Sequence, residues 1–376
     1  MKDIFIRLRN VFIHFCYTKI LKQMLFMFDP ESVHDRFVFT GKLLGTNAVT
    51  RRLTSFMFGY RHDMLRQTVA GITFDNPIGL AAGFDKNAEL TGILPSVGFG
   101  FAELGSITGE PCEGNPRPRL WRLPKSKSLA VYYGLKNDGC VAVADRLRDK
   151  TFFSPIGISI AKTNSQETCE TDAGIADYVK AFRIMQGIGD YYTINISCPN
   201  AYGGQPFTDA ERLGRLLTAL YEVECSKPIF IKLSPDIPEV ELEGIMDLVS
   251  RHRVTGFICT NLTKDRDKSE VKSKILDENI PENGGLSGKV VEGLSNDMIR
   301  YVYTKTNGRY PIIGCGGVFT AEDAYEKILS GASLVQMITG MIYEGPQVIS
   351  TINQGLKRLL VRDGHANISE AIGKRA

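Results

Sequence analysis

No CxxC pair occurs in this sequence, and only five histidines do. The eight cysteines are scattered, so neither a zinc module nor a dense disulfide framework is expected, and a reducing compartment suits such a chain. No histidine falls at the end of a strand assigned below, and we therefore predict no metal in the site. The net charge is +3 without a run of lysine or arginine, which argues against a nucleic-acid partner.

The sequence also lacks an apolar run long enough to cross a membrane. Residues 4–28 are rich in Ile, Leu, Phe and Met, but four cations interrupt them. The longest stretch without formal charge, residues 10–18, is about half of a spanning helix, and no small-residue cleavage site follows for a signal peptidase. Residues 1–70 carry eleven Lys or Arg and five Asp or Glu. This pattern is typical of a helix lying in a membrane interface, and packing on the chain's own domain is the alternative.

From residue 77 onward, short apolar runs alternate with stretches of helical spacing such as 208–223, 239–251 and 321–329. Apolar strands that alternate with helices indicate a parallel sheet covered on its outer face. Eight repeats, without a GxGxxG at a first helix, favour a closed (β/α)8 TIM barrel over an open doubly wound sheet. The predicted strands are residues 78–82, 101–105, 156–161, 192–197, 229–233, 256–260, 312–315 and 334–338. We expect a small helical extension over residues 1–70 and the barrel over 71–376.

The carboxyl ends of these strands should carry the chemistry, because barrels place their active sites there. The ends are rich in amides, hydroxyls and lysines and include a thiol, but they lack the carboxylate pair of a glycosidase. Around the end of the seventh strand, Gly314, Gly316 and Gly317 would let backbone N–H groups approach a phosphate closely, which we expect here, and a merely tight turn is the alternative. Two long inserts, residues 110–154 and 264–288, are expected to act as lids or pocket walls.

Seven short motifs follow one another along the chain. They are FDPESVH (28–34), LAAGFDKN (80–87), GNPRPRLWRLP (114–124), KLSPD (232–236), GGLSG (284–288), PIIGCGG (311–317) and GASLVQM (331–337). Together they resemble the quinone-linked dihydroorotate dehydrogenases, over about residues 28–352. The resemblance implies an FMN-binding barrel that oxidises dihydroorotate to orotate in pyrimidine synthesis and passes the electrons to quinone.

The resemblance also implies roles for individual residues. Lys86 would contact both flavin and substrate, with its cation on the substrate carboxylate, and Lys232 would stabilise the reduced flavin. Asn195, Asn200 and Asn261 match amides that bind the substrate ring, since an amide both donates and accepts hydrogen bonds. A solvated lysine, a surface ion pair and turn chemistry are the structural alternatives for these side chains. The other implied FMN contacts are Ala82, Gly83, Ser106, Ser159, Asn195, Thr260, Gly288, Gly317, Ile338 and Thr339.

Cys198, in NISCPN, stands where the resemblance implies the catalytic base that takes the substrate's C5 proton. The quinone-linked class has serine here, and cysteine is typical of the soluble class. A thiol ionises more readily than an alcohol, and we expect neighbouring Lys86 to lower its pKa further. Val131 and Leu262 replace an asparagine and a threonine that contact substrate in the family. We expect the remaining cysteines, Cys315 included, to be ordinary core residues.

Reoxidation of the flavin is implied to involve the N-terminal segment. His34 and Arg122 match polar positions of a tunnel through which quinone enters from the membrane, and a helix-packed histidine and a surface arginine are the alternatives. The implied location is peripheral, on the cytoplasmic face of a bacterial inner membrane or on the mitochondrial inner membrane. Val131 and Leu262 leave open an FMN barrel enzyme for a different cyclic substrate, and Cys198 leaves open fumarate or NAD as acceptor. A membrane-docked flavoprotein without activity would not require Lys86 or Cys198.

Overall fold

The computed structural model describes residues 2–376 and contains a closed barrel of eight parallel strands, each hydrogen-bonded to its neighbours in sequence order. The predicted (β/α)8 barrel is therefore confirmed, and every predicted strand is present with its ends shifted by two residues or fewer. The barrel strands are β3 (Ile78–Leu80), β4 (Phe101–Ile107), β7 (Ile156–Ile160), β8 (Tyr191–Asn195), β9 (Ile229–Leu233), β10 (Gly256–Cys259), β12 (Ile312–Cys315) and β13 (Ala332–Met337). The pairing of β13 with β3 closes the barrel.

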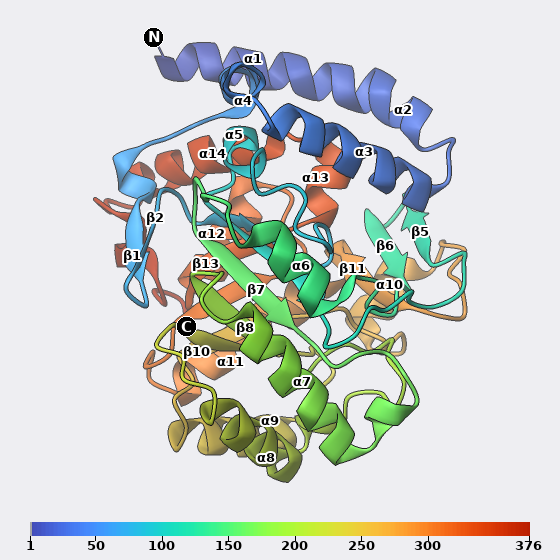
Figure 1. The fold of residues 1–376 in the computed structure, drawn as a ribbon. Coiled ribbons are helices and arrows are strands. Elements are labelled where there is room, and N and C mark those ends of the chain that lie inside the picture. The colour runs from blue at the N-terminus through green and yellow to red at the C-terminus, as the bar shows by residue number, and fades with distance from the viewer. Residues whose placement is uncertain (1) are drawn as a thin grey trace.

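Helices surround the barrel on its outer side (Figure 1). Their boundaries follow local capping chemistry: the Asp209 side chain accepts from the N–H of Arg212, and Thr320 and Asp323 form a reciprocal capping box. The helices that follow the strands are α5 (Leu94–Val97), α6 (Gly139–Leu147), α7 (Thr171–Met185), α8 (Ala210–Tyr221), α9 (Glu239–Ser250), α11 (Glu292–Lys305), α12 (Ala321–Leu329), α13 (Thr339–Glu344) and α14 (Val348–Arg362).

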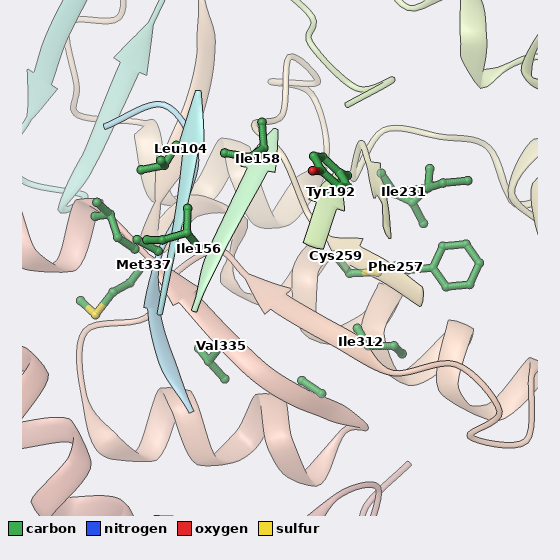
Figure 2. Close-up of a cluster of buried hydrophobic side chains, with 14 of the residues drawn as sticks. Leu104, Ile156, Ile158, Tyr192, Ile231, Phe257, Cys259, Ile312, Val335 and Met337 are labelled. Carbon is green, nitrogen blue, oxygen red and sulfur yellow. The ribbon is translucent and has the colours of Figure 1, made fainter. Parts of the chain in front are cut away.

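The main hydrophobic core lies between the strands and these helices. Alternate residues of each strand point outward into it, and Figure 2 shows such side chains, among them Leu104, Ile158, Tyr192 and Val335. Tyr192, for example, donates its hydroxyl to the carbonyl of Met185 in α7 at 3.0 Å. The strands are apolar on this face because burying it against the helices stabilises the barrel.

The barrel interior is arranged in layers along the axis. At the amino end, Phe101, Tyr191 and Phe230 pack with a hairpin formed by β1 (Gln67–Val69) and β2 (Ile72–Phe74). Gly79 is required here, because a Cβ atom at this position would lie 2.3 Å from the Phe101 ring. Above this apolar layer is a polar one, described below, and above that the strand ends open into a cavity.

The two long inserts pair with each other rather than forming separate loops. β5 (Leu120–Leu123) and β6 (Ser128–Val131) of the first insert form an antiparallel sheet with β11 (Gly285–Gly288) of the second, which also contains α10 (Ser269–Ile275). This small sheet supplies Leu120, Leu129 and Val131 to the cavity wall. The inserts are therefore pocket walls, as predicted, but they are built as a sheet.

The N-terminal segment forms four helices along one side of the barrel (Figure 1). They are α1 (Lys2–Cys16), continued through a π-helical turn (Tyr17–Leu21) into α2 (Lys22–Leu25), then α3 (Pro30–Gly45) and α4 (Ala48–Phe58). On α1, Asp3 accepts from Lys357 of α14 at 2.7 Å, and Arg9 donates to Ser350 at 2.9 Å. No helix within residues 2–376 is long and apolar enough to span a bilayer.

Candidate active site

A cavity lies at the carboxyl ends of the strands, with about 1300 Å³ of empty space that includes the solvent at its open mouth. It brings together almost every residue that the sequence singled out. The predicted residues that line it are His34, Ala82, Gly83, Lys86, Ser106, Asn195, Cys198, Asn200, Lys232, Thr260, Asn261, Gly288, Gly317, Ile338 and Thr339. Two predicted residues, Ser159 and Arg122, do not line the cavity.

Cys198 lies in the loop after β8 and faces this cavity. Burial raises the pKa of its thiol above the ordinary value, and the backbone of Asn200 and the cations Lys162 and Lys264 act against that rise. The prediction that Lys86 is the cation that lowers the pKa of Cys198 is wrong, because Lys162 is the foremost cation acting on the thiol. Lys162 is itself buried, and it donates to the carbonyl of Tyr202 at 2.8 Å.

Lys86 also lines the cavity, in the loop after β3. Its ammonium is 4.0 Å from the centre of the Tyr133 ring, a cation–π contact that holds a partly buried cation. Burial lowers the pKa of Lys86 to about 8, so the side chain remains mostly protonated at pH 7. His34 of α3 lies nearby with Nε2 2.9 Å from the Phe84 carbonyl, and burial and then the charge of Lys86 lower the pKa of its imidazole.

The predicted amides are held by a network around the end of β8. Asn195 donates to the Ser106 hydroxyl at 2.9 Å, and Ser106 is 2.7 Å from the Ser159 hydroxyl. Ser159 thus supports a cavity residue from behind. Asn261 donates to the Ser197 carbonyl at 2.8 Å. Asn200 donates to the Val131 carbonyl at 2.8 Å, whereas its buried Oδ1 has no hydrogen-bond partner among residues 2–376. A buried acceptor left without a donor fits a ligand that provides one.

The turn after β12 fits a phosphate group. Gly317 has φ of +74°, and a Cβ atom there would lie 2.4 Å from the Cβ of Glu292. The N–H groups of Gly316 and Gly317 donate to no acceptor in the described part of the chain. Free N–H groups in a glycine turn at the end of the seventh strand form the anion-binding nest that barrels use for mononucleotide phosphates. The residues present therefore fit FMN.

The floor of the cavity is polar. Lys232, of which only 4% is exposed, lies 3.9 Å from the carboxylate of Glu103, which is fully buried. Glu103 accepts from Thr193 at 2.9 Å and from Gln336 at 3.0 Å. Sequence reasoning missed Glu103 and Gln336. Their signal was a charged or amide side chain within an otherwise apolar strand, which is unusual because such groups are costly to bury.

Three further positions differ from expectation or were not predicted. Arg122 donates to the Phe28 carbonyl at 2.9 Å and lies over the Phe26 ring, so it joins β5 to the end of the α1–α2 region. Cys315 is not an ordinary core residue, because it is only partly buried and lines the cavity. Tyr133, the aromatic partner of Lys86, carried no sequence signal of its own.

A closed parallel barrel with a phosphate-type glycine turn and a thiol among amides and lysines defines an FMN-binding barrel oxidoreductase. The family model described as dihydroorotate dehydrogenase matches residues 64–360. The chain belongs to the dihydroorotate dehydrogenase family, which confirms the resemblance carried by the seven motifs and the dependence on FMN.

Individual relatives align with this sequence over almost its whole length. A protein of Trichodesmium erythraeum named dihydroorotate dehydrogenase (quinone) is 36% identical over 360 residues, covering 92% of this chain and 94% of its own. One of the same name from Synechocystis is 39% identical, covering 92% and 93%. The crystal structure of a ligand-free dihydroorotate dehydrogenase from Eimeria tenella superposes with a TM-score of 0.79 at 30% identity, covering 92% of this chain and 99% of that one.

Proposed function

We propose that this chain is a dihydroorotate dehydrogenase that oxidises dihydroorotate to orotate in pyrimidine synthesis, with FMN as cofactor and quinone as electron acceptor. The observation that carries the proposal is the single cavity that gathers Cys198, Lys86 and the three asparagines beside the glycine turn. Membership of the family supports the substrate and the cofactor, and the names of the relatives support the acceptor.

The residues that line the cavity would divide the work of the reaction between them. Lys86, protonated and held against Tyr133, would bind the substrate carboxylate, while the free acceptor of Asn200 would take an N–H of the ring. Cys198, as thiolate, would take the proton from the carbon next to the one that loses hydride, forming S–H as C–H breaks. FMN, when bound, supplies the acceptor for that hydride. We assign its phosphate to the turn at Gly317 and its ring to the floor above Lys232.

Anaerobic mixing with dihydroorotate tests this function directly. The absorbance of oxidised flavin should decrease after mixing, and the amount of orotate formed should equal the amount of flavin reduced. Val131 and Leu262 line the cavity and reduce its hydrogen-bonding capacity, so binding of orotate should be measured alongside. A flavoprotein that neither bleaches nor binds orotate would act on a different cyclic substrate.

We assign the acceptor site to the arm of the cavity that points to the N-terminal helices. His34 of α3 and the apolar side chains of Leu120, Leu129 and Ile342 line the cavity, and we assign them to this arm. An apolar passage with a polar side chain suits a quinone, whose carbonyl oxygens accept hydrogen bonds. Turnover with quinone in detergent should exceed turnover with fumarate or NAD; the opposite order would favour the soluble acceptor that Cys198 leaves open.

We also assign residues 1–70 to a peripheral membrane contact and residues 71–376 to the FMN barrel. Within residues 2–376, nineteen of the twenty-five exposed large apolar side chains lie between Ile4 and Met57. On α1, Leu8 and Phe12 are 66% and 69% exposed. An apolar surface of this density is unusual on a protein whose whole surface is exposed to solvent. The excess of cations in the segment would favour anionic lipid.

Flotation with phosphatidylserine vesicles tests the membrane contact. The double variant Leu8→Asp/Phe12→Asp should lose binding, because carboxylates on this face oppose insertion. Val240→Asp on α9, at a side chain 81% exposed, is the matched control and should bind as the wild type does. Equal loss in both variants, or in neither, would contradict a contact made by α1.

A further inference from the structure

A buried carboxylate lies one layer below the cavity floor and takes no part in the chemistry proposed above. Glu103 of β4 has no exposed surface, and its Oε2 accepts from Thr193 at 2.9 Å, Gln336 at 3.0 Å and Tyr191 at 3.4 Å. Its Oε1 has no hydrogen-bond partner among residues 2–376. The only cation within ion-pair distance in that range is Lys232, whose Nζ lies 3.9 Å from this Oε1.

Burying two charged groups costs free energy unless each charge stabilises the other. A buried carboxylate with a free oxygen is stabilised chiefly by a cation nearby, and Lys232 is buried as well. The three donors on Oε2 fix the carboxylate in one orientation and so direct Oε1 to the lysine. Because the surroundings exclude water, both charges act over longer distances than they would at a surface.

Lys232 lines the cavity, whereas Glu103 does not. A molecule in the cavity is therefore exposed to the field of the ammonium, reduced by that of the carboxylate behind it. Reduction of a bound flavin adds negative charge to it, so the ammonium favours the reduced state and the carboxylate opposes it.

We propose that Glu103 is a positioning residue, which holds Lys232 against the cavity floor and, by offsetting part of the field of that ammonium, lowers the midpoint potential of the bound FMN. The inference rests on the proposed function, since it requires FMN above Lys232. Glu103 thereby limits how strongly the protein holds the reduced cofactor, which helps the cofactor to be reoxidised by a second substrate.

The test is Glu103→Gln, which keeps the shape and an acceptor but removes the charge. A spectroscopic redox titration of the purified holoenzyme should show a higher midpoint potential. The expected shift is at least tenfold in the ratio of reduced to oxidised flavin at a given potential, or about 30 mV for a two-electron couple. Thr193→Val is the matched control, because it removes one donor from the same carboxylate without changing charge, and its potential should stay at the wild-type value.

Two results would overturn the inference: an unchanged potential in Glu103→Gln with FMN bound, or an equal shift in Thr193→Val. If Glu103→Gln does not fold, the test uses Lys232→Gln and the double variant Glu103→Gln/Lys232→Gln instead. The double variant buries neither of the two charges. Lys232→Gln should lower the potential and the second substitution should raise it again; no recovery refutes the role of Glu103. A wild-type protein that holds no FMN would instead refute the proposed function.

Discussion

Substitution of Cys198 should separate proton abstraction from cofactor binding. Burial keeps the pKa of this thiol above its ordinary value, so the thiol is mostly protonated at pH 7. The rate of flavin reduction at saturating dihydroorotate should therefore rise with pH through the neutral range, by up to about tenfold per pH unit. Cys198→Ala should lose about 10²- to 10⁴-fold in that rate, the usual contribution of a positioned base, and should still bind FMN.

Two further readouts make this prediction specific. Cys198→Ser should retain slow reduction whose rising limb lies at higher pH than in the wild type, because an alcohol ionises less readily. Lys86, with a pKa of about 8, is charged below that pH and neutral above it, so KM for dihydroorotate should increase above about pH 8 in all variants. Anaerobic stopped-flow measurement of the flavin band gives both quantities. Reduction of Cys198→Ala at the wild-type rate, or a flat wild-type profile, would refute the assignment of the base.

Three other predictions follow from single contacts. Lys162→Met should shift the rising limb of flavin reduction to higher pH, because it removes the foremost cation that acts on Cys198; an unchanged profile would assign Lys162 to structure alone. Glu31→Gln should weaken the docking of α3 by about 3 kcal/mol, since it leaves a buried arginine without its counter-charge, and hydrogen exchange of α3 measures this. Burial raises the pKa of the Glu31 carboxyl, but its arginine partners outweigh burial and hold that pKa below the usual value. The carboxylate therefore stabilises the docking of α3 above about pH 4.3, and this stabilisation is lost in more acidic solution. Protection of α3 from hydrogen exchange that does not change with pH would contradict this. Gly317→Ala should weaken FMN binding at least tenfold, whereas Gly187→Ala, which has the same sign of φ but open space at its Cβ, should bind FMN normally by fluorescence titration.

The sequence alone determined the barrel and most of the cavity's lining. Apolar runs of four to six residues separated by helical spacing leave few other folds, because strands buried on both faces must lie in a covered parallel sheet. Once the strand order was predicted, the strand ends had to meet at one edge, which placed Lys86, Asn195, Cys198 and Gly317 together. That part of the reasoning needed only local periodicity and the direction of the chain.

Tertiary structure decided which charges act on which groups. In a closed barrel both faces of a strand are buried, so the sequence could not tell that Glu103 points inward to Lys232 while Leu104 points outward. The same applies to the thiol: Lys86 shares the cavity with Cys198, yet the foremost cation that opposes the rise of the thiol's pKa is Lys162, brought close by the pairing of β7 with β8. Such contacts depend on the register of strands distant in sequence, and a single residue of slip would exchange the inner and outer faces.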